Sequence, residues 1–355
     1  MADLDHEAIT VRMGSRSGLP VIVAVHSTAL GQAVGGCRLW RYLDWRDGLD
    51  DALRLSAGMT LKCAAAGLGN GGGKTVIAVP HGAALSAAQR AAALRDAGDV
   101  IESLGGHYAA GPDVGTTPAD MVVISERTRH VFCAPEDRGG SGDSSPHTAA
   151  GVIAALREVC ARIHGSPDLS GRRLVIIGLG SVGGHLARQL CALGASLAVT
   201  DIDPGKQALA KDLGADWVQP GDAMTAQADV LVPAALGGVL TREIVPRLRC
   251  AAIAGPANNQ LAEPDVAGLL HRRGIVWVPD YVVSAGGVIY ALAVELHKQD
   301  PQTAAARVAA IAGTVRLLLD TAAQTRADPA TAALELAQRR LSAAARRPAP
   351  QQSAP

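Results

Sequence analysis

The chain has 355 residues, no formal net charge at neutral pH and a hydrophobic content of 48%. This length suggests two domains, each large enough for a core of its own. The balanced charge excludes a basic stripe suited to nucleic acid and a charged tail of the kind that binds partners. Because aromatic residues make up only 3% of the chain, aliphatic side chains and alanine must build the cores.

The N-terminal segment Met1–His6 is acidic and polar, unlike the basic and then apolar segment of a secretory signal. No uncharged apolar run reaches the roughly 18 residues of a membrane-spanning helix. The cysteines contain no CxxC pair, which favours buried free thiols in a reducing compartment over disulfides or a metal site. They are Cys37, Cys63, Cys133, Cys160, Cys191 and Cys250. We therefore expect a cytoplasmic protein without a metal site and without nucleic acid or membrane partners.

Periodicity and turn residues predict the elements of the first part of the chain. In chain order they are a strand over 20–26, a helix over 47–65 that stops at Gly67, a turn at glycines 71–73, a strand over 75–79 that ends at Pro80, a helix over 85–104, a loop over 111–115 and a helix that begins at Thr117-Pro118.

Residues 139–144, rich in glycine and serine, form the best linker candidate, and Ser145-Pro146 starts a helix that reaches about His164. From Arg172 on, strands and helices alternate with βαβ spacing, which implies a parallel sheet. The expected segments are 174–177, 182–193, 197–200, 204–213, 230–232, 251–254 and 275–278, followed by a helical stretch over about 304–345.

Two lysines stand out, since charged side chains seldom enter apolar surroundings without a partner or a task. Lys74 closes the run Gly71-Gly72-Gly73, and Lys62 lies twelve residues earlier in an apolar stretch. The expected helix and strand would bring the two lysines to the same end of the pair. There, either Lys74 reaches out to solvent, or a neighbouring cation lowers its pKa so that it can act as a base.

A strand, a GxGxxG turn and a helix follow one another from Arg173, as a dinucleotide-binding fingerprint requires. Gly178 makes the tight turn, Gly180 admits the pyrophosphate, and Gly183 lets the helix pack closely on the strand. The turn and helix start also contain Leu179, Ser181 and Val182. The alternative is a glycine-rich turn in another doubly wound fold.

The second strand of this unit ends at Asp201, 21 residues after Gly180, and is followed by Ile202. An acidic side chain there accepts hydrogen bonds from ribose hydroxyls and repels a 2′-phosphate, which favours NAD over NADP. The fingerprint lies in the middle of the chain, which speaks against FAD.

Further motifs occur in a fixed order along the chain. They are Gly35-Gly36-Cys37-Arg38, Gly58-Met59-Thr60-Leu61-Lys62, Gly71-Gly72-Gly73-Lys74, Pro112-Asp113-Val114-Gly115, the fingerprint, Ala257-Asn258-Asn259-Gln260-Leu261, Pro279-Asp280-Tyr281 and Ser284-Ala285-Gly286-Gly287-Val288-Ile289. From about Val21 to Leu296 the chain resembles the leucine/valine/phenylalanine dehydrogenases of the glutamate dehydrogenase superfamily.

The resemblance implies NAD-dependent, reversible oxidative deamination of an L-amino acid to a 2-oxo acid and ammonia. It implies that Lys62 pairs with the substrate carboxylate, Lys74 is the general base that activates water, and Asp113 shuttles protons. It also implies a nicotinamide site, to which it assigns Thr148, Ala234, Ala235 and Asn258. By themselves these residues have simpler interpretations, with Asp113 and Asn258 as turn or cap residues and Thr148 as a first-turn hydroxyl.

The resemblance further implies a set of substrate contacts. They are Val34, Gly35, Gly36, Met59, Gly111, Pro112, Ser284, Val288 and Ala291. The small residues Val34 and Gly111 favour a wide pocket, whereas the segments 26–31 and 142–145 resemble the valine enzymes. The side chain accepted therefore stays open between branched-chain and aromatic. No further lysine is placed for a second carboxylate, so we expect no acidic substrate.

The expected fold is α/β with two domains: an N-terminal α/β domain for substrate and oligomerisation, and a C-terminal Rossmann-type NAD-binding domain, with a cleft between them. The expected boundaries are 1–138 and 139–320, then 321–345 as helices that pack back on the first domain and 346–355 as a disordered tail. By resemblance the protein is a homo-oligomer.

Three residues depart from the family pattern: Ser284 replaces an asparagine, Pro256 a small residue and Cys37 a threonine. The alternative function is therefore a specialised homologue in a secondary pathway that reduces an imine or acts on an unusual amino acid. A non-enzymatic NAD-binding regulator would be expected to lack Lys74 or Asp113, and both are present.

Overall fold

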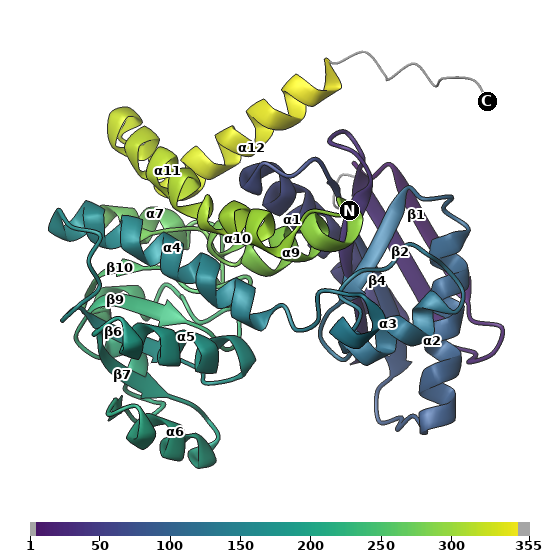
Figure 1. Ribbon diagram of the computed structural model, residues 1–355, viewed down its shortest axis with the longest axis horizontal. Helices are drawn as coiled ribbons and strands as arrows, with labels where there is room; N and C mark the ends of the chain where they lie inside the picture. Colours follow the sequence, from purple (N-terminus) through teal and green to yellow (C-terminus); the bar gives the residue numbers. More distant parts are fainter. Residues whose placement is uncertain (1–4, 347–355) are drawn as a thin grey trace. The chain divides into compact units, whose positions relative to one another are not determined.

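The computed structural model describes residues 5–346 (Figure 1). Its contacts define two compact units, one formed by the chain up to Asp143 together with the chain from Glu335 on, and one formed by Ser144–Leu334. Within the described residues, no helix is long and apolar enough to cross a membrane. Of the predicted disordered tail, all but Arg346 lies outside the described residues.

The first unit is built on a five-stranded sheet with the order β1-β2-β4-β3-β5. Its strands are β1 (Ala8–Met13), β2 (Pro20–Ser27), β3 (Ala33–Tyr42), β4 (Gly71–Pro80) and β5 (Tyr108–Pro112). The first two strands pair antiparallel to their neighbours, and β4, β3 and β5 run parallel to one another. Parallel pairing places the ends of β4, β3 and β5 along one edge of the sheet.

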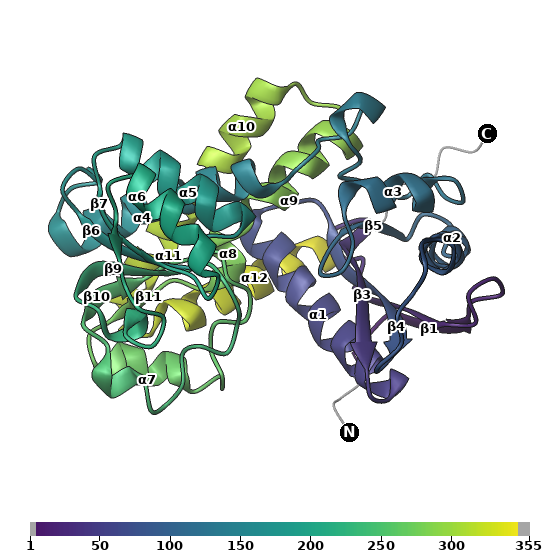
Figure 2. The ribbon, with the colours of Figure 1, turned by 90° about the horizontal axis from the view of Figure 1, so that it is seen from below.

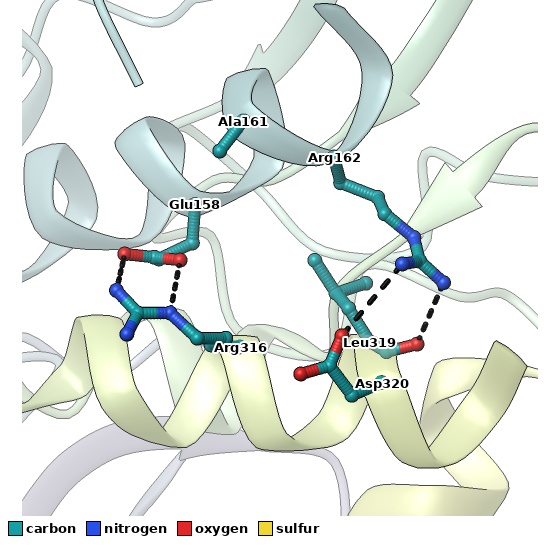
Figure 3. A pocket seen from close by; sticks show the side chains of 6 residues that line it. All are labelled: Glu158, Ala161, Arg162, Arg316, Leu319 and Asp320. Atoms are coloured by element: carbon teal, nitrogen blue, oxygen red, sulfur yellow. Dashed lines mark hydrogen bonds and ion pairs between the residues drawn. The ribbon is translucent and has the colours of Figure 1, made fainter. Parts of the chain in front are cut away.

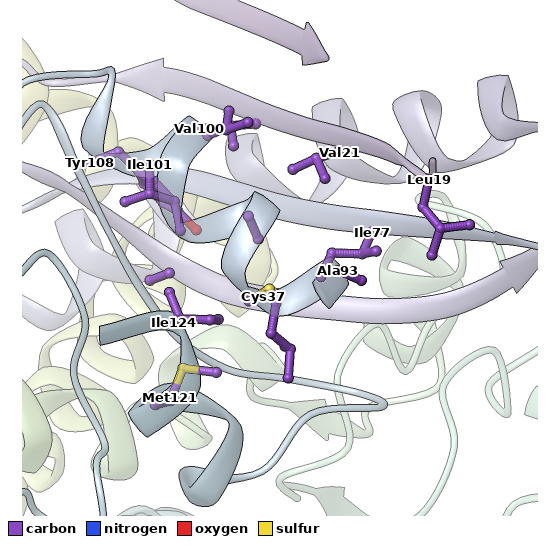
Figure 4. Packing of buried hydrophobic residues seen from close by; sticks show 14 of the residues in the cluster. Leu19, Val21, Cys37, Ile77, Ala93, Val100, Ile101, Tyr108, Met121 and Ile124 are labelled. Atoms are coloured by element: carbon purple, nitrogen blue, oxygen red, sulfur yellow. The ribbon is translucent and has the colours of Figure 1, made fainter. Parts of the chain in front are cut away.

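Helices cover both faces of this sheet. Helix α1 (Trp45–Ala66) buries Ala52 against Ile22, Ala24 and Val76 on one face. Helices α2 (Ala87–Glu102) and α3 (Pro118–Ser125) pack on the other face, where Figure 4 shows the larger apolar core. That core contains leucine, isoleucine, valine and alanine side chains, with Tyr108 as its largest buried member.

The sequence predictions for these elements are partly confirmed. The predicted strand 20–26 and helix 47–65 exist as β2 and α1, and Gly67 caps α1 with a left-handed φ of 69°. The strands β1 and β3 were not predicted. The turn at glycines 71–73 is wrong, because these residues are the first three of β4, and the loop 111–115 is wrong at its start, because Gly111 and Pro112 end β5.

The second unit contains a six-stranded sheet, whose order is β11-β10-β9-β6-β7-β8 and whose pairings are all parallel. The strands are β6 (Arg173–Ile177), β7 (Ser196–Thr200), β8 (Asp216–Trp217), β9 (Ala228–Pro233), β10 (Cys250–Ile253) and β11 (Val276–Trp277). The predicted parallel sheet is confirmed. Its order is that of a doubly wound dinucleotide-binding fold, in which the chain reverses direction across the sheet after β8.

The helices of this unit lie around its sheet (Figure 2), and those between β6 and β11 connect successive strands. The helices are α4 (Ser145–His164), α5 (Ser181–Ala192), α6 (Gln207–Asp212), α7 (Val266–Arg272), α8 (Asp280–Val283), α9 (Gly286–Ala291), α10 (Pro301–Ala309) and α11 (Ile311–Thr325), with a π-helical segment at Leu292–Leu296 after α9. The segment from α7 to α9 was not predicted, apart from β11.

Helices α4 and α11 lie side by side and are joined by ion pairs around a shallow pocket (Figure 3). Arg316 donates two hydrogen bonds to Glu158, at 2.9 and 2.6 Å, and Arg162 bonds the carbonyl of Leu319 and lies 3.7 Å from Asp320. Because the arginine side chains of these pairs are 65% and 38% exposed, each pair contributes at most about 1 kcal/mol.

The last helix, α12 (Pro329–Ala345), contributes to the first unit through Arg340. Arg340 Nη1 donates to the carbonyls of Ala64 and Ala65 at 2.8 and 2.7 Å. These carbonyls are among the last of α1, and that of Ala64 also accepts from the Gly67 N–H at 3.1 Å. Arg340 therefore adds a charged donor to the cap of α1 from a distant part of the chain.

We expect Arg340→Met to lower the free energy of unfolding by about 1–3 kcal/mol, because two carbonyl groups lose a charged donor. Arg339→Met is the matched control, since Arg339 only faces the exposed Glu335 at 3.6 Å and should change stability by less than about 0.5 kcal/mol. Urea unfolding at one fixed protein concentration measures both. Equal effects of the two substitutions would contradict the capping role.

Candidate active site

A buried ion pair lies at the centre of the first unit. Lys74, on β4, has a side chain only 6% exposed, and its Nζ lies 2.8 Å from Oδ2 of Asp113, which follows β5. Gly36 of β3 lies directly beneath both groups: a Cβ added there would come within 2.6 Å of Asp113 Cβ and 3.1 Å of Lys74 Nζ. The structure therefore brings together Lys74, Asp113 and Gly36.

Arg38, two residues after Gly36 on β3, reaches the same carboxylate oxygen. Its Nε donates to Asp113 Oδ2 at 2.9 Å. Burial would raise the pKa of Asp113, but Lys74 and Arg38 outweigh it and lower that pKa to about 2. Asp113 is thus held as an anion at neutral pH.

Burial is also the main influence on Lys74 and lowers the pKa of its ammonium group, because a charge in a dry environment loses its hydration. Asp113 opposes this and raises the pKa, while Arg38 lowers it further. The sequence had suggested repulsion from Lys62 as the cause; in the structure the leading cause is burial, and Arg38 also lowers the pKa.

The glycine run has a steric reason to stand before Lys74. A Cβ on Gly72 would come within 2.1 Å of the backbone nitrogen of Thr60 in α1, and one on Gly73 would meet the ring of Tyr108. A Cβ on Gly35 would meet the carbonyl of Gly73. These glycines let α1 and the neighbouring strand approach β4 closely. The segment of α1 that carries Met59 and Lys62 is therefore packed against the start of β4.

The remaining substrate residues predicted for this unit lie along the same strands. Val34 is fully buried and pairs with Gly72 and Ala109 in the sheet. Gly111 pairs with Gly36, and Pro112 pairs with Cys37.

The space beside Gly111 is filled by an aromatic ring. A Cβ on Gly111 would come within 2.5 Å of the ring of Phe132, which is 5% exposed. A wide substrate pocket at Gly111 stays a prediction, while Phe132 takes the place of the missing side chain on this side of Gly111. The sequence contained one signal for it: Phe132 is the only phenylalanine of the chain.

In the second unit, the fingerprint residues adopt the geometry that a bound dinucleotide requires. Gly178 has a φ of 106°, and a Cβ on Gly183 would meet the carbonyl of Gly178. Gly180 has open space around it and is the N-cap of α5, where no side chain caps the helix. The free N–H groups of that helix start, at Ser181 and Val182, suit a phosphate.

Asp201 lies at the end of β7 and is half-buried, whereas Ile202 beside it is exposed. The Leu179 backbone N–H donates to Asp201 Oδ2 at 2.7 Å, and the Asp203 backbone N–H donates to Oδ1 at 2.9 Å. The carboxylate is thus fixed next to the fingerprint turn, where it retains lone pairs for a ribose hydroxyl.

Ala234 and Ala235 follow β9 and pack on the fingerprint: the Ala234 N–H donates to the carbonyl of Ile177, and Ala235 lies against Gly178. Asn258 is exposed in the turn after β10. These residues and the fingerprint all follow the carboxyl ends of parallel strands, where doubly wound sheets bind their ligands. The residues present therefore fit a dinucleotide.

A second group forms where α9 packs on the start of α4. A Cβ on Gly287 would come within 2.6 Å of Thr148 Oγ1, and one on Gly286 would meet the carbonyl of His147. Ser284, 9% exposed, ends α8 just before this contact. Val288 and Ala291 lie on α9 itself. The structure brings Thr148 together with the segment that starts at Ser284.

Sequence reasoning assigned no role to Arg38, although the motif Gly35-Gly36-Cys37-Arg38 had been noted. Its partner Asp113 lies 75 residues further along the chain. Only the parallel pairing of β3 with β5 brings the two together. Within residues 5–346, no cluster of histidine, cysteine, aspartate and glutamate suits a metal ion.

Comparison with known proteins decides the family. A family model described as Glu/Leu/Phe/Val dehydrogenase, dimerisation domain, matches residues 6–130, and one described as Glutamate/Leucine/Phenylalanine/Valine dehydrogenase matches residues 204–347. The chain belongs to the Glu/Leu/Phe/Val dehydrogenase family. It is accordingly an amino acid dehydrogenase, an oxidoreductase that acts on CH–NH2 donors.

Individual relatives cover most of the chain. Leucine dehydrogenase of Geobacillus stearothermophilus is 42% identical over 290 residues, which are 81% of this chain and 78% of that protein. Valine dehydrogenase of Streptomyces albus is 39% identical over 96% of this chain and 93% of its own. The crystal structure of L-tryptophan dehydrogenase from Nostoc punctiforme matches with a TM-score of 0.82 at 32% identity, and the match covers 97% and 98% of the two chains. The resemblance and the two-domain α/β fold expected from the motifs are confirmed.

For this dehydrogenase we expect Gly36→Ala to lower kcat/KM at least about 100-fold, because the added methyl would displace Lys74 Nζ or Asp113 from their contact. The control is Gly313→Ala in α11, where nothing lies within 4 Å of an added Cβ. It should leave activity unchanged and stabilise the helix by about 0.5–1 kcal/mol. Steady-state kinetics of both variants tests this, and full activity of Gly36→Ala would contradict the geometry.

Proposed function

We propose that the protein catalyses the NAD-dependent, reversible oxidative deamination of a hydrophobic L-amino acid to its 2-oxo acid and ammonia. The observation that carries this proposal is the buried contact between Lys74 and Asp113. A lysine whose pKa is lowered by burial, beside a carboxylate that stays charged, matches what this reaction demands of a protein.

In the proposed mechanism, Lys62 pairs with the substrate carboxylate, and the substrate lies next to the backbone of Gly35 and Gly36. NAD, held by the fingerprint turn and Asp201, would supply the acceptor for the hydride that leaves Cα. Neutral Lys74 takes the proton from the water that attacks the resulting iminium carbon, and Asp113 passes protons to and from the nitrogen. A dry site strengthens the attraction between Lys62 and the carboxylate.

The proposed cofactor is NAD rather than NADP. The support is the fixed carboxylate of Asp201 at the end of β7, next to the fingerprint turn. A 2′-phosphate would meet this negative charge, while a 2′-hydroxyl can donate to it. We propose that Gly178–Gly183 hold the pyrophosphate and that Thr148, Ala234, Ala235 and Asn258 contact the nicotinamide and its ribose.

For the substrate side chain we propose contacts with Val34, Met59, Gly111, Val288 and Ala291. All are apolar, and so is Phe132 beside Gly111. Such a surface suits a branched-chain or aromatic amino acid and offers no partner to a second carboxylate. The relatives named leucine, valine and tryptophan dehydrogenase span the same range.

We further propose that the protein is a homo-oligomer in the cytoplasm. The match of residues 6–130 to a model described as a dimerisation domain supports the first point. The six cysteines form no disulfide within residues 5–346, which is compatible with the second.

Ser284 favours a second candidate, a specialised dehydrogenase that reduces an imine or serves an unusual amino acid. Serine ends α8 beside the contact between Thr148 and Gly287, and it offers one hydroxyl where the family pattern has an amide. Its shorter side chain would leave room for a different substrate group.

The first experiment follows the absorbance of reduced nicotinamide with L-Val, L-Leu, L-Ile, L-Phe and L-Trp, each with NAD and with NADP. We expect turnover with NAD, and we expect Lys74→Ala to lower kcat by about 10²- to 10⁴-fold. Lys211→Ala, on the exposed surface of α6, is the matched lysine control and should be fully active.

The pattern of results separates the candidates. Turnover that disappears only in Lys74→Ala supports the proposal, and the order of substrates identifies the side chain accepted. Binding of NAD without turnover of any of the five amino acids would reject it in favour of the imine-reducing alternative.

The pH dependence provides a separate test. Because burial lowers the pKa of Lys74, kcat/KM for deamination should rise with pH through a midpoint below the ordinary lysine value of 10.5. Below that midpoint Lys74 carries its proton and cannot accept another. A pH series of kcat/KM measures the midpoint, and a value at or above that of a free lysine would contradict the role of burial.

A further inference from the structure

Beyond the ion pair itself, a chain of alternating charges extends from Lys74 through the first unit. Asp113 Oδ2 accepts from both Lys74 Nζ and Arg38 Nε, at 2.8 and 2.9 Å. Arg38 then continues from β3 to α1, where its Nη1 donates to Asp51 Oδ2 at 2.9 Å. One guanidinium therefore joins the carboxylate beside Lys74 to a carboxylate on α1.

Asp51 is itself held in place from both sides. Tyr42, at the end of β3, donates its hydroxyl to Asp51 Oδ2 at 2.9 Å, and Arg54 donates to Oδ1 at 2.7 Å. With these partners Asp51 fixes the fork of Arg38, whose side chain is 18% exposed. Two fixed ends leave the guanidinium little freedom to turn away from Asp113.

The bonds of this network join three cationic side chains, Lys74, Arg38 and Arg54, to the two carboxylates Asp113 and Asp51. Arg54 lies at the outer end with a side chain 55% exposed, so solvent screens its charge. At the inner end Asp113 lies between two cations, Lys74 and Arg38. With Lys74 neutral, Asp113 still has a permanent cation at hydrogen-bonding distance.

We propose that Arg38 is a positioning residue that serves as the permanent counter-ion of Asp113, so that Lys74 can release its proton while Asp113 stays charged. This inference rests on the proposed function of Lys74 as the base. Without Arg38, Lys74 would be the remaining cation in contact with Asp113. The Asp113 carboxylate would then stabilise the protonated form of Lys74. The pKa directions agree, since Arg38 lowers the pKa of both Lys74 and Asp113.

The Cys37 thiol near Lys74 does not change this charge arrangement. The Cys37 thiol on β3 stays protonated, because burial raises its pKa to about 12. The charged or titratable groups that surround the pair are Arg38, Cys37 and Tyr42 on β3, Asp113 after β5, Tyr108 on β5, Asp51, Arg54 and Lys62 on α1, and, on the far side of the sheet, Arg90 and Asp120.

The test compares Arg38→Met, Arg38→Lys and the wild type. In Arg38→Met the midpoint of the kcat/KM profile should move up by about one to three pH units, the range expected for loss of a neighbouring charge. Arg38→Lys should restore most of the wild-type midpoint, because it keeps the charge. Asp51→Asn, which frees the fork of Arg38, should shift the midpoint in the same direction by less.

Arg90→Met is the matched structural control. Arg90 also forms a two-pronged ion pair, with Asp120 at 3.0 and 2.7 Å, but on the opposite face of the sheet. It should lower stability as Arg38→Met does without moving the pH midpoint. An unchanged midpoint in Arg38→Met, or an equal shift in Arg90→Met, would overturn the proposal.

A second readout does not depend on turnover. The chain contains five lysines (Lys62, Lys74, Lys206, Lys211 and Lys298), so NMR of ¹³Cε-labelled lysine can follow Lys74 directly, assigned by Lys74→Arg. Its titration should move up in Arg38→Met and stay in place in Arg90→Met, and a titration that does not move would overturn the role of Arg38. An inactive wild type whose Lys74 titration still moves with Arg38 would reject the proposed function and leave this inference standing.

Discussion

Lys74 Nζ and Asp113 Oδ2 face each other across 2.8 Å, at a place where the lysine side chain is 6% exposed. Burying a charge costs several kcal/mol unless partners replace the lost water, so neither group would remain there alone. Arg38 gives the carboxylate a second donor, and Gly36 leaves the space in which the two side chains meet. The parallel strands β4, β3 and β5 carry these residues, with Asp113 directly after β5, and hold them at that distance.

Glycine weakens a strand, because it orders a flexible backbone and packs no side chain, yet β4 begins with three in a row. The contacts at Gly72 and Gly73 explain why. The first lies within van der Waals range of the backbone of α1 at Thr60, and the second lies under the ring of Tyr108. The glycines make β4 locally less stable but allow α1 to approach it closely. This close packing holds the segment of α1 that carries Lys62 against β4.

The sequence predicted the second unit better than the first, because the motifs of the second unit lie within short stretches of sequence. The fingerprint from Gly178 to Gly183 and the acid at Asp201 are local features of one βαβ unit. Strand β3 was missed because Gly35-Gly36 interrupts its apolar pattern, and the glycines before Lys74 were taken for a turn because glycine usually marks one. These glycines are strand residues because they contact α1 and Tyr108. Such contacts join distant parts of the chain and cannot be recognised in a short stretch of sequence.

The same limit applies to the space beside Gly111. A glycine there suggests room for a substrate, but the neighbouring segment occupies it. The backbone N–H of Phe132 donates to the carbonyl of Ala110, so this segment is held on β5 whatever its side chain. The ring then fills the volume that a side chain at 111 would have used. On this side of β5 the residue at position 132 therefore limits the space, and Gly111 alone does not determine it.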